Sequence, residues 1–187
     1  MPGYYDLTDD MRIPKRWHLR SPLDERGQAI APWLFRKGQW CEPQGTIRFP
    51  VKPEGLALDF TLASSAIPVV HGRVVQLMER LGIQEVQFLP AQVEGHGEPY
   101  FVLNALRVIR CIDDTRCEEV RYWRPEDNRP DKEGEYKVVA GMRIDPTRVG
   151  DARLFRPWGW TVALIVSEEL KQAMEKECIS GVKFVQV

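Results

Sequence analysis

The clearest hydrophobic pattern lies near the end of the chain, where an apolar run is followed by an amphipathic stretch. Residues 161–166 are an unbroken Thr-Val-Ala-Leu-Ile-Val run, the composition of a strand covered on both faces, so they predict the central strand of a sheet. Ser167 follows as a helix N-cap, and apolar residues then recur at helical spacing over residues 170–178. Residues 182–187 predict a terminal strand, which completes a strand, helix and strand.

A similar pattern occurs 96 residues earlier. Residues 166–184 align without gaps on residues 70–88, with seven identities in nineteen positions, among them Met78 with Met174 and Ile83 with Ile179. Internal duplication explains this match, but chance also explains it, because amphipathic helices before strands share a pattern without a common origin. On either explanation, two similar helix–strand units are predicted.

The rest of the pattern predicts mainly strands. We expect the first helix over residues 68–81, ended by Gly82, and an antiparallel hairpin of residues 86–93 with 100–110, which residues 111–121 continue. Further strands are predicted over residues 3–7 (a short edge strand), 46–51, 56–62, 136–144 and 149–155. The predicted fold class is α+β: a mixed, mainly antiparallel sheet with two main helices in similar helix–strand units and an irregular N-terminal arm.

The N-terminal segment has a different composition from the remainder. This arm, residues 1–45, loses periodicity from Thr8 onward and is rich in proline and in tryptophan (Trp17, Trp33 and Trp40). Because each tryptophan buries on the order of 200 Å², we expect the arm to lie on the body of the domain, residues 46–187; the alternative is an exposed aromatic patch for a partner. Residues 1–187 are thus expected to form a single domain.

Composition and charge narrow the possible partners and the compartment. The chain has 26 basic and 27 acidic residues and a formal net charge of −1, which favours neither nucleic acid nor membrane as a direct partner. Its four cysteines (Cys41, Cys111, Cys117 and Cys178) lack the close spacing of a zinc site and are typical of reduced thiols in a cytoplasm. There is no leader-like start and no apolar run of about eighteen residues, so we expect a cytoplasmic protein without a membrane span.

The sequence lacks a recognisable reaction centre. It has no Gly-x-Ser-x-Gly motif and no glycine-rich phosphate loop, and its three histidines (His18, His71 and His96) are scattered singly. Asp113-Asp114 with Glu118-Glu119 could hold a divalent cation, although such pairs are more typical of a solvated turn. Trp158-Gly159-Trp160 is either packing for the following strand or a binding surface. We therefore expect no catalytic site, no cofactor and no metal.

Several segments resemble a known bacterial family in order and spacing. They are Pro99-Tyr-Phe-Val-Leu-Asn-Ala-Leu, Cys111-Ile-Asp-Asp, Ile144-Asp-Pro-Thr-Arg-Val-Gly-Asp-Ala-Arg-Leu-Phe-Arg, Leu164-Ile-Val-Ser-Glu-Glu-Leu-Lys and Gly181-Val-Lys-Phe. The likeness covers roughly residues 58–187 and is to the eleventh numbered immunity family of polymorphic-toxin systems, formerly a domain of unknown function and common in myxobacteria.

The resemblance implies an immunity protein, or antitoxin, for bacterial competition. Such a protein binds a cognate toxin encoded beside it and prevents self-intoxication in the cytoplasm; in myxobacteria the neighbours often look like HNH-like nucleases. The family supplies no catalytic residue that could be carried over, so the resemblance implies a toxin inhibitor and not an enzyme.

An inhibitor of a basic nuclease would contact it with carboxylates and aromatic side chains. One region of the sequence is rich in both. The predicted partner-binding residues are Asp113, Asp114, Glu118, Glu119, Tyr122, Trp123, Glu126 and Asp127. They adjoin the polar loop 121–135, which is longer than a connection between neighbouring strands requires. Two other hypotheses remain: an unfamiliar enzyme acting on a nucleotide or modified protein through Asp59, His71 or Asp145, and a homodimeric adaptor module.

Overall fold

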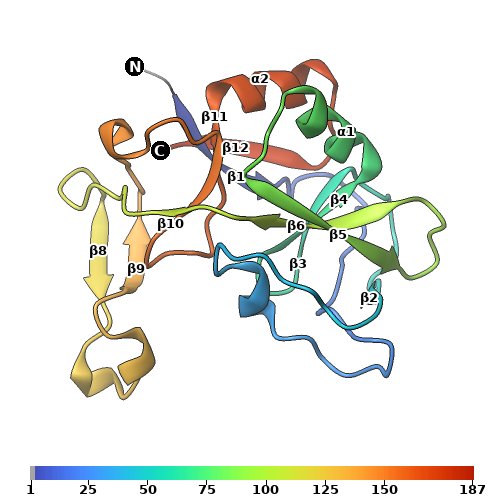
Figure 1. The fold of residues 1–187 in the computed structure, drawn as a ribbon, viewed down its shortest axis with the longest axis horizontal. Coiled ribbons are helices and arrows are strands. Elements are labelled where there is room, and N and C mark those ends of the chain that lie inside the picture. The colour runs from blue at the N-terminus through green and yellow to red at the C-terminus, as the bar shows by residue number, and fades with distance from the viewer. Residues whose placement is uncertain (1–2) are drawn as a thin grey trace.

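The computed structural model describes residues 3–187 and contains two five-stranded sheets, a separate hairpin and two helices that lie side by side (Figure 1). The first sheet has the order β12 (Val182–Gln186), β1 (Tyr4–Asp9), β11 (Ile165–Ser167), β10 (Leu154–Pro157) and β7 (Val108–Ile109). The second has the order β2 (Ile47–Phe49), β5 (Val86–Val93), β6 (Tyr100–Ala105), β4 (Ile67–His71) and β3 (Phe60–Ala63). The hairpin consists of β8 (Glu119–Tyr122) and β9 (Tyr136–Ala140).

The helices are α1 (Gly72–Arg80) and α2 (Glu168–Lys176), and the 3-10 turns are η1 (Pro32–Phe35), η2 (Pro125–Asp127), η3 (Pro130–Lys132) and η4 (Pro146–Arg148). Most strand pairs are antiparallel; β2 with β5 and β7 with β10 are parallel. The predicted α+β class, with a mixed, mainly antiparallel arrangement, is confirmed, although the strands form two main sheets and not one.

The two predicted helix–strand units occupy equivalent places in their sheets. The bounds of α1 and α2 differ by 96 residues at both ends. One strand lies between the strand that precedes each helix and the strand that follows it: β6 lies between β4 and β5, and β1 lies between β11 and β12. Both middle strands are antiparallel to their neighbours, so the strands joined by each helix run parallel to each other.

Strand register repeats with the same spacing. His71 pairs with Tyr100, and Ser167, 96 residues after His71, pairs with Tyr4, 96 residues before Tyr100. The two middle strands differ in their place along the chain. Strand β6 comes after the helix–strand unit whose sheet it completes, whereas β1 comes before its unit, with most of the chain between them. Each half of the chain therefore gives its first described strand to the sheet of the other half, an arrangement that supports an internal duplication with exchanged strands.

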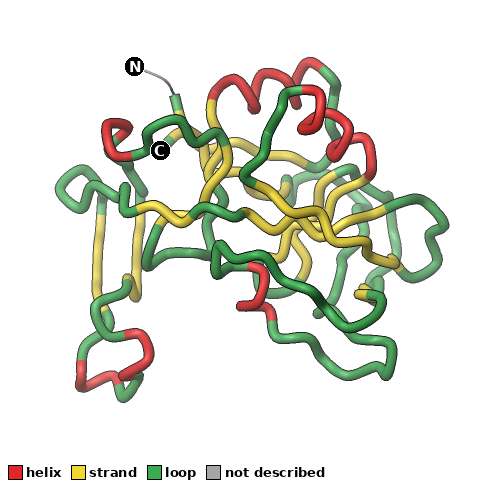
Figure 2. Tube along the Cα trace, viewed as in Figure 1, coloured by secondary structure: helices red, strands yellow, loops and turns green. Residues whose placement is uncertain are grey.

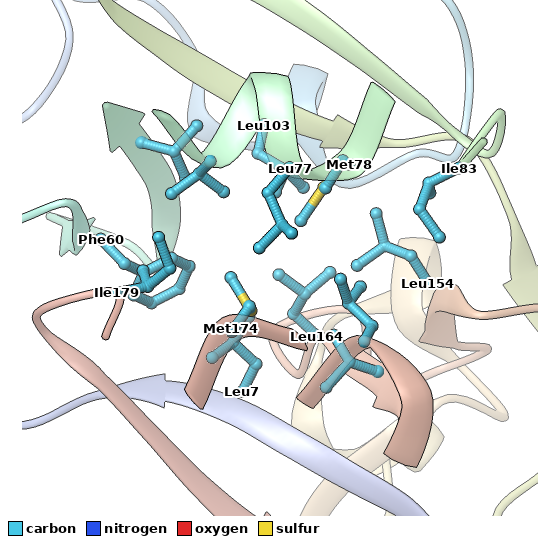
Figure 3. Packing of buried hydrophobic residues seen from close by; sticks show 14 of the residues in the cluster. Leu7, Phe60, Leu77, Met78, Ile83, Leu103, Leu154, Leu164, Met174 and Ile179 are labelled. Carbon is cyan, nitrogen blue, oxygen red and sulfur yellow. The ribbon is translucent and has the colours of Figure 1, made fainter. Parts of the chain in front are cut away.

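Equivalent residues from the two halves meet in one core. Side chains of α1 face those of α2 (Figure 3). The buried set contains the pairs Val70 and Val166, Val74 and Leu170, Met78 and Met174, Ile83 and Ile179, and Leu103 and Leu7. Because both helices have apolar residues at this spacing, each covers its own sheet and also packs on the other helix.

Each half also carries a long insertion that covers the outer face of a sheet. Residues 10–59 include the arm, whose Trp17 is fully buried and donates from Nε1 to the hydroxyl of Thr61 at 2.8 Å. Residues 106–153 include the hairpin and a cluster around Cys111, where burial raises the pKa of the thiol to about 12. Figure 2 shows that the arm is mostly loop, as predicted; residues 1 and 2 lie outside the described residues.

Several predicted strand positions were wrong. The segment predicted as a short edge strand, residues 3–7, is the start of β1, which lies inside its sheet. Residues 100–110 do not form one strand with a continuation through 111–121, because β7 crosses to pair with β10 and β8 pairs with β9. Local pattern cannot show these partners, since most lie far away in sequence.

The strand predicted over residues 161–166 is central to its sheet but shorter than expected. Only Ile165–Ser167 is a strand, because Nη1 of Arg156 donates to the carbonyls of Thr161 (2.8 Å) and Ala163 (3.2 Å). These carbonyls therefore accept hydrogen bonds from a side chain, and the first part of the predicted strand forms a turn instead.

The first helix is also shorter than predicted. It begins at residue 72, because the β-branched residues before it form β4 and His71 is the N-cap, accepting from the N–H of Arg73 at 3.2 Å. Residues 68–71 were thus wrongly included in the helix.

Ser167→Ala is expected to lower the free energy of unfolding by about 1 kcal/mol. The hydroxyl of Ser167 accepts from the N–H of Leu170 at 3.3 Å, and alanine removes this acceptor from the start of α2. Urea denaturation followed by circular dichroism measures the loss. Ser167→Thr retains a hydroxyl and is the control; equal losses in both variants would show that the hydroxyl does not cap the helix.

Candidate partner-binding site

The hairpin β8–β9 projects from the body of the molecule (Figure 1) and contains two of the predicted partner-binding residues. Its tyrosines, Tyr122 and Tyr136, have ring centroids 4.9 Å apart, and both hydroxyls donate to the carboxylate of Asp114. Burial and this hydrogen bond raise the pKa of Tyr136, and the same carboxylate raises the pKa of Tyr122. Asp114 thus fixes the hairpin to the preceding turn.

The loop at the hairpin tip contains regular local structure. Residues 123–135 contain η2 and η3. The N–H of Arg124 donates to Asp127 at 3.0 Å, and Asp127 also forms an ion pair with Lys137 on β9. That ion pair holds the pKa of Asp127 below its usual range. The tip is therefore tied to the stem and presents a defined shape.

Trp123 lies half-buried where this tip meets the stem. Three cations lie over its ring, with their charged groups 5.8 Å (Arg129), 5.4 Å (Lys132) and 5.1 Å (Lys137) from the ring centroid. The negative face of the indole attracts such charges. Three basic residues thus lie around this indole ring: Arg129 and Lys132 from the tip and Lys137 from the stem.

The predicted carboxylates do not form one free acidic patch. Asp113 accepts from the N–H and hydroxyl of Thr115, at 3.2 and 2.7 Å. Glu119 pairs with Arg121 at 2.8 Å. The side chain of Glu118 lies against the backbone of Gly141, and Glu126 is exposed. Asp127 also pairs with a cation, whereas Asp114 accepts only from tyrosine hydroxyls, so part of the negative charge is balanced locally.

A cleft of about 740 Å³ lies between the hairpin tip, the arm and the turn that joins β10 to β11. Its lining residues are Trp33, Arg36, Lys37, Trp123, Arg129, Asp131, Lys132, Glu135, Tyr136, Lys137, Gly159, Trp160, Thr161 and Val162. The cleft thus lies where the insertion of the first half, residues 10–59, meets the insertion of the second half, residues 106–153. Most of the three tryptophans of the arm were expected to pack on the body, but Trp33 is 58% exposed and Trp40 is 66% exposed. Of the two tryptophans around Gly159, only Trp160 lines this cleft.

The groups considered for an enzyme have other partners. Asp59 and His71 are 4.0 Å apart, between Oδ1 and Nδ1, but His71 Nδ1 caps α1 and Oδ2 of Asp59 accepts from Arg73 and from the hydroxyl of Ser180, both at 2.9 Å. Asp145 caps η4 by accepting from Thr147. These contacts stabilise the fold.

Within residues 3–187, no group of three or more His, Cys, Asp or Glu side chains is arranged to hold a metal ion. No helix in that range has the length and apolar character needed to cross a bilayer.

Residues 1–187 match the immunity protein family (Imm11), so the match includes the arm, which lies outside the range of the resemblance seen in the sequence, roughly residues 58–187. No curated protein matches the chain.

Proposed function

Because the chain belongs to the immunity protein family Imm11, we propose that it binds a cognate toxin and neutralises it by occupying the toxin surface, without catalysing a reaction. Family membership is the observation that carries this proposal. An inhibitor of this kind needs a stable, complementary surface and no reactive centre. The hairpin and the cleft beside it provide exposed aromatic groups on an ordered frame.

We place the toxin-binding surface on the hairpin and the turn before it. The residues are those that the sequence predicted: Asp113, Asp114, Glu118, Glu119, Tyr122, Trp123, Glu126 and Asp127. Trp123 is the proposed anchor, because binding energy concentrates in aromatic and arginine side chains. Asp114 and Asp127 act by holding the shape of the hairpin, and Glu126 is free to meet a basic group of the toxin.

The proposed toxin is a nuclease of the HNH-like type, and the proposed site of action is the cytoplasm of the producing cell. The resemblance to myxobacterial systems supports the nuclease, and four unpaired cysteines among the described residues are compatible with a reducing compartment. A nuclease must be blocked where the cell keeps its nucleic acid, which is why inhibition is placed inside the cell.

Co-expression tests this function. The toxin domain encoded next to the gene is expressed in a susceptible bacterium, alone and together with this protein, and survival is counted. Survival only in the presence of the protein is expected, together with co-purification of the two chains. Equal killing with and without the protein would refute the function.

His71→Ala is expected to lose about 1 kcal/mol of folding stability through the missing cap of α1 and to leave protection intact. The reason is that His71 stabilises a helix and has no proposed role in a reaction. Denaturation and the survival assay measure the two effects, and Ser167→Ala, at the equivalent cap of α2, is the matched control. A folded His71→Ala protein that binds the toxin without protecting the cell would favour the enzyme hypothesis.

A further inference from the structure

We propose that the cleft between η1 and the hairpin tip receives an acidic segment of the toxin, a peptide stretch with Asp or Glu side chains. This inference rests on the proposed function and specifies part of its interface. The sequence alone predicted carboxylates facing a basic partner, whereas the lining of the cleft has the opposite sign.

The first observation is the balance of charges among the residues that line the cleft. Five cationic side chains line it, against Asp131 and Glu135. Arg129 pairs with Asp131 at 2.8 Å, and Lys137 pairs with Asp127 just outside the lining. Lys132 lies over Trp123 without an ion pair in the described chain, and Arg36 and Lys37 of the arm also have none there. Three cations therefore face Glu135 alone, and the cleft attracts anions.

Arg36 is the second observation, because one donor of its guanidinium, Nε, lacks an acceptor in the described chain. Its Nε is buried without a hydrogen-bond partner among residues 3–187, and burial lowers its pKa. Buried donors of this kind are normally satisfied, and a charged donor without an acceptor is costly. A carboxylate entering the cleft would supply charge-assisted acceptors for the guanidinium.

Arg156 lies behind the same wall and adds to the positive field. It is fully buried, and its Nη1 donates to the carbonyl of Thr161, a lining residue, while Nε and Nη2 have no partner in the described chain. Its pKa is lowered to about 9, first by burial and then by the charge of Arg36, against the opposing charge of Asp6. The two arginines thus repel each other, and a bound anion reduces that repulsion.

A protein segment fits this cleft better than a nucleic acid does. Proteins that bind single strands offer a series of free aromatic faces on which successive bases stack. Here Arg129, Lys132 and Lys137 lie over the ring of Trp123, which leaves Trp33 and Trp160 as the other tryptophans of the cleft. The formal net charge of the whole chain is −1, which opposes general attraction of a polyanion. A short acidic stretch meets only the local positive field and can still pack against Trp33 and Trp160.

Charge reversal tests the proposal. The affinity of a catalytically inactive form of the toxin domain encoded next to the gene is measured by calorimetry with wild type, Lys37→Glu, Lys132→Glu and the control Lys52→Glu. Lys52 is exposed and does not line the cleft. Both cleft variants are expected to bind at least about tenfold more weakly, and the control within about twofold of wild type. Lys37→Gln, which removes the charge without reversing it, is expected to fall between.

The possible outcomes separate this inference from the function on which it rests. Wild-type affinity in all cleft variants would overturn the acidic-segment proposal and leave the inhibitor function standing. Failure of the wild-type protein itself to bind the toxin would refute the function as well. A labelled single-stranded oligonucleotide is titrated in parallel; binding that is lost in Lys37→Glu, with toxin affinity unchanged, would assign the cleft to nucleic acid and overturn the proposal. Thermal melting confirms that each variant is folded.

Discussion

Leu7→Ala is expected to lower the free energy of unfolding by roughly 2–5 kcal/mol, as much as Leu103→Ala in the middle of the chain. Leu7 is 1% exposed and Leu103 is fully buried, and both lie in the core between the helices. Positions this close to a chain end usually tolerate substitution. Here the cost is large because β1 is an interior strand of the sheet formed by the second half, so truncation leaves a cavity in the shared core.

Urea denaturation of the two variants measures both losses, and Thr8→Ala on the same strand is the control. Thr8 is half-buried and lies outside that core, so its truncation is expected to cost less than about 1 kcal/mol. A loss at Leu7 no greater than the loss at Thr8 would mean that β1 does not complete the first sheet, between β11 and β12.

Trp123→Ala is expected to weaken toxin binding by about 2 kcal/mol or more, which is about thirtyfold in Kd. The indole is both the proposed contact and the group around which Arg129, Lys132 and Lys137 gather. Its removal therefore takes away an anchor and releases the cations that shape the cleft. Most of the effect is expected in the dissociation rate, because interface truncations act mainly there. Surface plasmon resonance with the toxin measures both rates.

Trp40→Ala is the matched control for this prediction. Trp40 is 66% exposed but lines a different cleft, beside Cys41 and Pro90. Its truncation is expected to leave the dissociation rate unchanged. A normal dissociation rate in Trp123→Ala, together with a faster one in Trp40→Ala, would show that the toxin binds the arm and not the hairpin.

The helix–strand units could be predicted because their signals are local. A helix N-cap and an apolar stripe lie within short stretches of sequence, and the likeness of the two units, which are 96 residues apart, is visible in the sequence itself. The exchanged strands could not be predicted in this way, because β1 pairs with strands near the other end of the chain. The sequence nevertheless contained one indication of this pairing: Tyr4 and Leu7 precede Tyr100 and Leu103 by the same 96 residues. Extending the alignment to the start of the chain would have predicted an interior strand.

The candidate site was predictable only in part, for a similar reason. Trp123 stood out as an aromatic residue beside a long polar loop, and the structure places it at a cleft. The basic character of that cleft depends on Arg36 and Lys37, which come from the arm and are distant in sequence from the hairpin. Ion pairs such as that of Asp127 with Lys137 also depend on the folded hairpin. A count of acidic residues in the loop therefore predicted a more negative surface than the folded protein presents.

The proposal that the protein inhibits by binding is tested most directly by titrating the purified chain into a fixed amount of the active toxin domain and measuring residual toxin activity. A binding inhibitor is expected to abolish activity in proportion to the protein added, reaching completion only near molar equivalence, with no dependence on incubation time once the complex has formed. Complete loss of activity at a small fraction of molar equivalence, increasing with time, would show that the protein inactivates the toxin by turnover and would contradict the account.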